Sequence, residues 1–422
     1  MDKEILTVGA VAEIITSIRS ENIILNDKIN KCRSILNSNT RSPEPINPHK
    51  ELIKFMIKYK IDPDYLKKIT IESAIEKEDL EMIKLLSENR NLGEFQIIEA
   101  VKKNHIEMVK LLLNYKTNIC TDKDNSLKYA SRLGYIDMVK LLLEEGADVN
   151  INGNYPLRIA SEKGHTSIVK LLLEASADIN INDNYPLRIA SSQGHIDIIK
   201  LFLEKGVDAN IRDNYPLRIA SFEGHTDVIK LLLEREQSSI HTNKNIALKC
   251  ASQRGHTSIV QLLLEAKADV HDDDNFALRY ASVTGHTSIV QLLLEAGGNV
   301  HADDDYALRG ASSEGHTSIV QLLLEKEANV HAGNDYSLRL SSKNGHTSIV
   351  KLLLEAGANI HAFDDYALRW ASDHGHTSIV KLLLEAGANV HAKNDYALER
   401  ASTNNHVDII QLLNQYSVID SE

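Results

Sequence analysis

The sequence repeats itself about every thirty residues over most of its length, and this period limits the folds open to the chain. Three copies, starting at residues 154, 184 and 305, read NYPLRIASEKGHTSIVKLLLEASADIN, NYPLRIASSQGHIDIIKLFLEKGVDAN and DYALRGASSEGHTSIVQLLLEKEANVH. A small residue recurs in register at twelve positions: Ala74, Ala100, Ala130, Ala160, Ala190, Ala220, Ala251, Ala281, Ala311, Ser341, Ala371 and Ala401. Because a unit this short cannot bury its apolar face alone, the period predicts a stack of mutually covering repeats.

Each unit reads as two short antiparallel helices joined by a Gly-His turn. Pro156 is expected at the start of the first helix, where its missing N–H has no partner to lose. Gly164 ends that helix in a left-handed conformation, and Asn104 and Asn405 substitute for it in other repeats. The second helix begins near Thr166, and its apolar face is so wide that adjacent units must cover it. The sequence therefore predicts an all-α protein.

The segments PLRxA, Gly-His, IVxLLL and GADVN resemble the ankyrin repeat over residues 71–416. The resemblance implies an ankyrin-type helical solenoid that binds other proteins without catalysing a reaction. The unit is shorter than the usual repeat of about 33 residues, and the loss falls before the first helix, so we expect shortened hairpin fingers. Tyr and Arg also replace the family's Thr and His in TPLH. The short finger and near-identical copies are similar to the ankyrin proteins of giant DNA viruses of amoebae (mimivirus type), which implies a host protein as target.

Both ends of the chain depart from the repeat, as the caps of such stacks do. Residues 1–70 contain two stretches with helical periodicity and a Pro-rich linker near residues 38–49. We expect this region to cap the first repeat. The alternative is a substrate adaptor, in which residues 1–70 recruit a host complex such as ubiquitin machinery. Residues 417–422 are predicted to be a short polar tail.

Charge and cysteine content limit the partners and the compartment. The formal net charge is -12, and the repeats carry the excess acid, so we expect no nucleic acid and favour a basic protein partner. The three cysteines are far apart and lack metal-ligand spacing, which favours a reducing compartment. Neither a secretion signal nor a membrane-spanning segment is evident. We expect a monomer in the cytoplasm, or in the host cytoplasm or nucleus if the protein is viral.

Histidine is the main candidate for chemistry, with eighteen copies. Neighbouring repeats lie about 8–10 Å apart, whereas two ligands of one zinc ion lie within about 4 Å of each other. Histidines in register cannot share an ion, and a metal-dependent enzyme is the weakest of the functional hypotheses. Catalysis needs one singular constellation, and here Ser, His and Asp recur in every unit. We expect no catalytic residue, metal or cofactor. The histidines in register include His165, His195 and His225 in the turns and His301, His331, His361 and His391 in the links between repeats.

Arginines of the first helices and acidic residues of the links also recur in register. One interpretation is that these side chains form ion pairs between adjacent repeats, each pair contributing little. The other is that the acidic tips, including Asp273 and Asp304, dock a basic partner.

Variation between repeats concentrates on the first helix, at the residue before the repeated alanine and at the pair before the glycine. By resemblance, this helix and the finger line the concave binding face of the family. The candidate protein-binding residues are Trp370, Tyr280 and Leu340 on that helix, Phe222 in the pair, and Phe363 in a link. The alternative is that these side chains fill gaps between repeats.

The resemblance also implies a modification. In ankyrin proteins the Asn that closes the segment LLLxxGADVN can be hydroxylated by a host dioxygenase. Asn150, Asn180 and Asn210 match that position, whereas later repeats have His there. We expect these three residues to be candidate hydroxylation sites.

Overall fold

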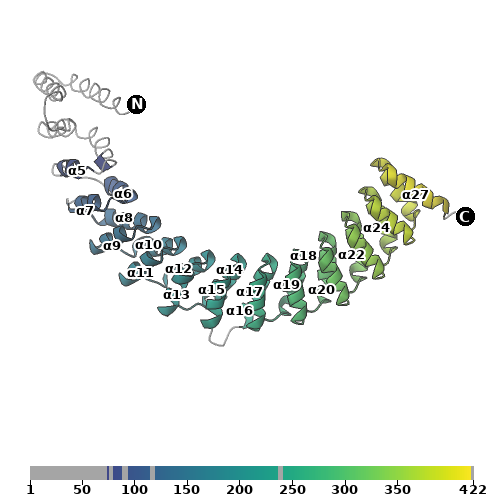
Figure 1. The fold of residues 1–422 in the computed structure, drawn as a ribbon, viewed down its shortest axis with the longest axis horizontal. Coiled ribbons are helices and arrows are strands. Elements are labelled where there is room, and N and C mark those ends of the chain that lie inside the picture. Colours follow the sequence, from purple (N-terminus) through teal and green to yellow (C-terminus); the bar gives the residue numbers. More distant parts are fainter. Residues whose placement is uncertain (1–73, 76–78, 88–93, 115–118, 236–240, 420–422) are drawn as a thin grey trace, which may run out of the picture. The chain divides into compact units, whose positions relative to one another are not determined.

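The computed structural model describes residues 74–419 except for 76–78, 88–93, 115–118 and 236–240. All regular elements in these ranges are α-helices, which confirms the predicted all-α repeat solenoid (Figure 1). The chain divides into two compact units, Met1–Asp178 and Ile179–Glu422, which are described separately here. The predicted cap and recruitment region, residues 1–70 with the linker near 38–49, lies outside the described residues.

The first unit contains the pairs α6–α7, α8–α9 and α10–α11, preceded by α5. First helices α6, α8 and α10 contact one another in sequence, and second helices α7, α9 and α11 do the same. The bounds are α5 Leu80–Ser87, α6 Glu94–Lys102, α7 Ile106–Asn114, α8 Ile119–Leu133, α9 Ile136–Glu144, α10 Ile151–Lys163 and α11 Thr166–Glu174.

The second unit repeats this arrangement from α12 to α27, with even-numbered first helices in one row and odd-numbered second helices in the other. The last helix continues to Ile419, so residues 417–419 are helical although the sequence placed them in the tail. The bounds are α12 Ile181–Gln193, α13 Ile196–Glu204, α14 Ile211–Glu223, α15 Thr226–Arg235, α16 His241–Arg254, α17 Thr257–Glu265, α18 Asp272–Val283, α19 Thr287–Glu295, α20 Ala302–Glu314, α21 Thr317–Glu325, α22 Ala332–Asn344, α23 Thr347–Glu355, α24 Ala362–Asp373, α25 Thr377–Glu385, α26 Ala392–Thr403 and α27 Val407–Ile419.

The core is one small apolar set repeated along the stack. In the repeat of α24 and α25, Leu368 and Ala371 from the first helix and Ile379, Val380 and Leu383 from the second are at most 1% exposed. Complete burial of such aliphatic side chains contributes about 1.5–3 kcal/mol each. The small Ala371 side chain lets neighbouring helices approach closely, which explains the recurring alanine.

The Gly-His turn joins neighbouring repeats within each unit. Gly315 has the left-handed φ of 88° that the sequence predicts for this position. The ring of His346 in the next repeat lies directly against it, and Nε2 of His346 donates a hydrogen bond to the carbonyl of Ser313 at 2.9 Å. The register of the turn histidines is therefore explained by contacts between repeats.

The link differs from the shortened hairpin that the resemblance implies, because no β-strand occurs among the helices and turns described. Its finger is a left-handed turn of three residues, as in Phe363, Asp364 and Asp365 with φ of 52°, 55° and 52°. Such turns occur at 152–154, 182–184, 273–275, 303–305, 333–335, 363–365 and 393–395. Asn, Asp and Gly tolerate this conformation best, which explains the composition of the links. The right-handed helix begins one residue later, so Pro156 lies in its first turn as predicted.

The end of the second helix offers a test of backbone conformation. Gly357 there has φ 86° with no atom near its missing Cβ, whereas Glu327 occupies the same position of another repeat with φ 63°. Because a side chain in this conformation costs about 1 kcal/mol, we expect Glu327→Gly to raise the free energy of unfolding by about that amount in urea denaturation. Gly357→Glu should lower it similarly. If Glu327→Gly is no more stable than wild type, the strained left-handed conformation assigned to residue 327 is wrong.

Candidate protein-binding surface

In α12, α18, α20, α22 and α24 the arginine of the first helix holds the left-handed turn of its own repeat. Arg309 donates hydrogen bonds from Nε to the carbonyl of Asp304 and from Nη2 to the carbonyl of Asp303, both at 2.7 Å. Arg369 makes the same two bonds, also at 2.7 Å, to the carbonyls of Asp364 and Phe363. The main partner of this arginine ladder is therefore backbone, and the predicted ion pairing between repeats is a secondary contact.

The guanidinium groups also lie between tyrosine rings. The Arg309 carbon Cζ is 5.6 Å from the ring centre of Tyr306 in its own repeat and 5.7 Å from that of Tyr336 in the next. At these distances a cation–π attraction contributes about 0.5–1 kcal/mol. From Tyr306 to Tyr396 these side chains form a ladder in which Arg309, Arg339 and Arg369 each contact the tyrosine rings of two repeats.

In the turns 273–275, 303–305, 333–335 and 363–365 the third residue is buried and binds the next link. Asp365 is 4% exposed, and its Oδ1 accepts the backbone N–H of Asn389 at 2.8 Å. Nδ1 of His361 lies 3.2 Å from the same oxygen. Asn275 performs the same role toward Asn299 at 2.7 Å. The acidic residues at this third position hold the links together. The interpretation of the link acids as a docking strip is therefore wrong for this position.

Some of the other link acids form ion pairs, and some are exposed to solvent. Nζ of Lys249 lies 2.6 Å from Asp272 and 3.1 Å from Asp273. Burial opposes the charge of Lys249, but hydrogen bonds to both carboxylates outweigh it and raise the pKa of the lysine. Arg279 forms the predicted inter-repeat ion pair with Asp303 at 2.7 Å. Of the two acidic candidates, Asp273 is exposed but paired, and Asp304 is exposed.

Phe363 and Trp370 belong to one line of rings along α24. The Arg339 guanidinium lies 4.3 Å from the ring centre of Phe363 and 5.3 Å from that of Tyr366. The Tyr366 and Trp370 ring centres are 5.5 Å apart. Trp370 is half-buried, whereas Phe363 is 55% exposed. Two candidates that are distant along the helix therefore form one surface through Arg339 of the preceding repeat.

Phe363 combines two unfavourable properties. It is a bulky residue with φ 52°, where other repeats have Asn152, Asn182 or Gly333. It also exposes the largest share of any aromatic ring in the described part of the chain. Backbone strain of this kind is characteristic of functional sites.

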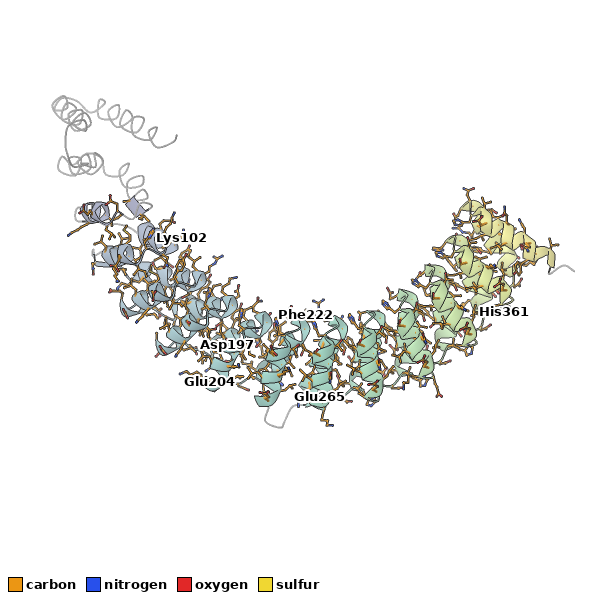
Figure 2. The ribbon with its side chains drawn as sticks, in the orientation of Figure 1. Lys102, Asp197, Glu204, Phe222, Glu265 and His361 are labelled. Atoms are coloured by element: carbon orange, nitrogen blue, oxygen red, sulfur yellow. The ribbon has the colours of Figure 1, made fainter. Side chains whose placement is uncertain are left out.

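The remaining aromatic and aliphatic candidates lie in other repeats. The Tyr280 ring stacks on Phe276 with centres 4.0 Å apart, and Phe222 lies beneath the Arg254 guanidinium at 3.9 Å. Leu340 is half-buried on α22. Figure 2 shows Phe222 at the edge of the stack opposite Glu265, which ends a second helix. The structure thus joins Phe363 to Trp370, whereas ring contacts of Tyr280 and Phe222 lie in other repeats.

Sequence reasoning missed Lys343, whose Nζ lies 4.9 Å from the centre of the Trp370 ring. The lysine belongs to the variable pair before the Gly-His turn of the preceding repeat. Its place in the variable pair could have indicated the contact with Trp370, because first helices of adjacent repeats pack side by side.

The three Asn residues proposed for hydroxylation each lie immediately before a first helix and are exposed. Oδ1 of Asn150 accepts the backbone N–H of Asp178 at 3.1 Å. The backbone N–H of Asn210 donates to Asp208 Oδ1 at 2.8 Å. Asn180 occupies the matching place before α12.

Within the described ranges, no group of three His, Cys, Asp or Glu side chains is placed to hold a metal ion, and no helix is long and apolar enough to cross a membrane. No curated protein matches the sequence. The family model described as Ankyrin repeats (3 copies) matches residues 71–153, 150–213, 187–274, 217–304, 250–334, 278–364 and 338–421.

Proposed function

The chain belongs to the ankyrin-repeat family, and we propose that it captures one partner protein through its first helices and links, with Phe363 and Trp370 at the centre of the contact. Ankyrin repeats typically serve as non-catalytic scaffolds for protein–protein interaction. The proposed partner is a host protein in the cytoplasm or nucleus of an infected cell, which the likeness to giant-virus repeats suggests. Exposed link acids such as Asp304 would meet basic groups on it.

The observation that carries this proposal is the conformation and exposure of Phe363. An Asn at this position would remove both the strain and the exposed apolar ring, as in the repeats that contain Asn152 and Asn182. A residue that lowers stability and gains little burial is best explained by a contact made with another molecule. Its continuity with Trp370 extends that contact along α24, where aromatic anchors typically dominate binding energy.

The test is Phe363→Asn, compared with wild type by affinity capture from a host-cell lysate and by denaturation. We expect the variant to be about as stable as wild type, because the relieved backbone conformation gains about 1 kcal/mol and the lost Arg339 contact costs about 0.5–1 kcal/mol. We expect it to retain at least tenfold less of a specifically captured protein. Loss of capture at unchanged stability separates binding from folding.

The matched control is Lys393→Asn, which relieves the same conformation, φ 53°, at the same position of the next repeat. This variant should gain about 1 kcal/mol in free energy of unfolding and capture the partner as wild type does. If Phe363→Asn retains every captured protein at wild-type level, the proposal is overturned.

A further inference from the structure

Basic and polar groups gather around Trp370 at the C-terminal end of α24. Lys343 of the preceding repeat places Nζ 4.9 Å from the centre of the indole ring. The His374 ring centre lies 5.6 Å from that of Trp370, and its Nδ1 lies 2.9 Å from the Trp370 carbonyl oxygen. The half-buried indole therefore presents an apolar surface with an ammonium group on its face.

The carboxylate nearest to this group along α24 is already neutralised. Asp373 has a side chain only 8% exposed, and its Oδ1 accepts a hydrogen bond from Arg400 Nε at 2.7 Å. Nδ2 of Asn404 donates to the same oxygen at 2.9 Å. The hydrogen bond and charge of Asp373 raise the pKa of Arg400, as a fixed ion pair requires. With this acid paired, Lys343 leaves the surroundings of Trp370 locally positive on a chain of formal net charge -12.

We infer that the Trp370 surface binds an acidic segment of the partner, with a carboxylate against Lys343 and an apolar side chain against the indole. This inference rests on the proposed function and specifies what the partner presents at this end of the repeat. A basic segment would place two ammonium groups within a few ångströms of each other, whereas a carboxylate gains an attraction there. The link acids lie at the other end of the first helix, so the partner would present basic groups there and acidic groups here.

Trp370 is the only tryptophan, so its fluorescence reports binding at this surface directly. The probes are a short peptide of glutamates around a central leucine and its counterpart with lysines in place of the glutamates. We expect the glutamate peptide to change Trp370 emission saturably and to bind at least tenfold more tightly than the lysine peptide at physiological ionic strength. Long-range attraction to the acidic chain favours the opposite order, so this preference must be local.

Lys343→Glu should weaken binding of the glutamate peptide at least tenfold. The matched control is Lys351→Glu in the same repeat, which changes the net charge equally but lies on the second helix with its side chain 67% exposed. This control should bind as wild type does. Tighter binding of the lysine peptide, no emission change with either peptide, or an unchanged affinity in Lys343→Glu overturns the acidic assignment. None of these outcomes alters the Phe363→Asn capture result, which decides the proposed function separately.

Discussion

Replacing Gly315 with alanine is expected to lower the free energy of unfolding by about 3 kcal/mol. The left-handed φ of 88° costs an alanine about 1 kcal/mol. The new Cβ would also lie 2.7 Å from Cε1 of His346, so the ring must leave its place. Displacing that ring breaks its hydrogen bond to the Ser313 carbonyl, which costs about 1–3 kcal/mol where the group stays buried. Urea denaturation at unchanged m-value measures the loss.

Gly357→Ala is the matched control for this substitution. Its φ of 86° is nearly the same, but no atom lies within 4 Å of the added Cβ. We expect the free energy of unfolding to fall by about 1 kcal/mol, which is the cost of the left-handed conformation alone. Equal losses in Gly315→Ala and Gly357→Ala would show that the histidine contact between repeats contributes nothing to stability.

Replacing Asp335 with alanine should cost about 2 kcal/mol, while asparagine at this position should change stability by less than about 0.5 kcal/mol. The Asp335 side chain is 6% exposed, and Oδ1 accepts the backbone N–H of Asn359 at 2.7 Å. Alanine leaves that N–H without its acceptor in a partly buried link. Asparagine restores an acceptor, as Asn275 does for Asn299.

The comparison of the two Asp335 variants, by denaturant midpoint, distinguishes a hydrogen bond from a charge effect. An asparagine variant as unstable as the alanine variant would mean that the carboxylate charge, through His331 Nδ1 at 3.1 Å, holds the link. Wild-type stability in both variants would mean that the link does not depend on this side chain.

The helix pairs could be predicted because their signals are local. Pro156 and Gly164 mark the two ends of one short helix, and the spacing of Ile168, Val169 and Leu172 defines the buried face of the next. The conformation of the link could not be predicted in the same way. A run of Asn and Asp is compatible with several turns, and in the repeat that begins with α20 two hydrogen bonds from Arg309, further along the chain, hold the left-handed one.

The candidate site was predicted in part. The position of Trp370 in the variable column and of Phe363 in a link marked both residues, but their contacts with Arg339 and Lys343 come from the preceding repeat. The arginines of the first helices and the link acids illustrate the same limit of prediction from sequence. The sequence placed Arg309 and the link acids in register, yet it could not distinguish a bond to the Asp304 carboxylate from the observed bond to its carbonyl.

The sequence by itself determined the fold class, the helix pairs and the Gly-His turns, because these depend on apolar spacing and on a glycine that accepts a left-handed backbone within one repeat. Only the tertiary structure decided which polar and aromatic side chains form contacts between repeats and which remain exposed at the surface. Such contacts join neighbouring repeats, about thirty residues apart in the chain, as between the His346 side chain and the Ser313 carbonyl or between Lys343 and Trp370. That pairing is set by how the repeats stack.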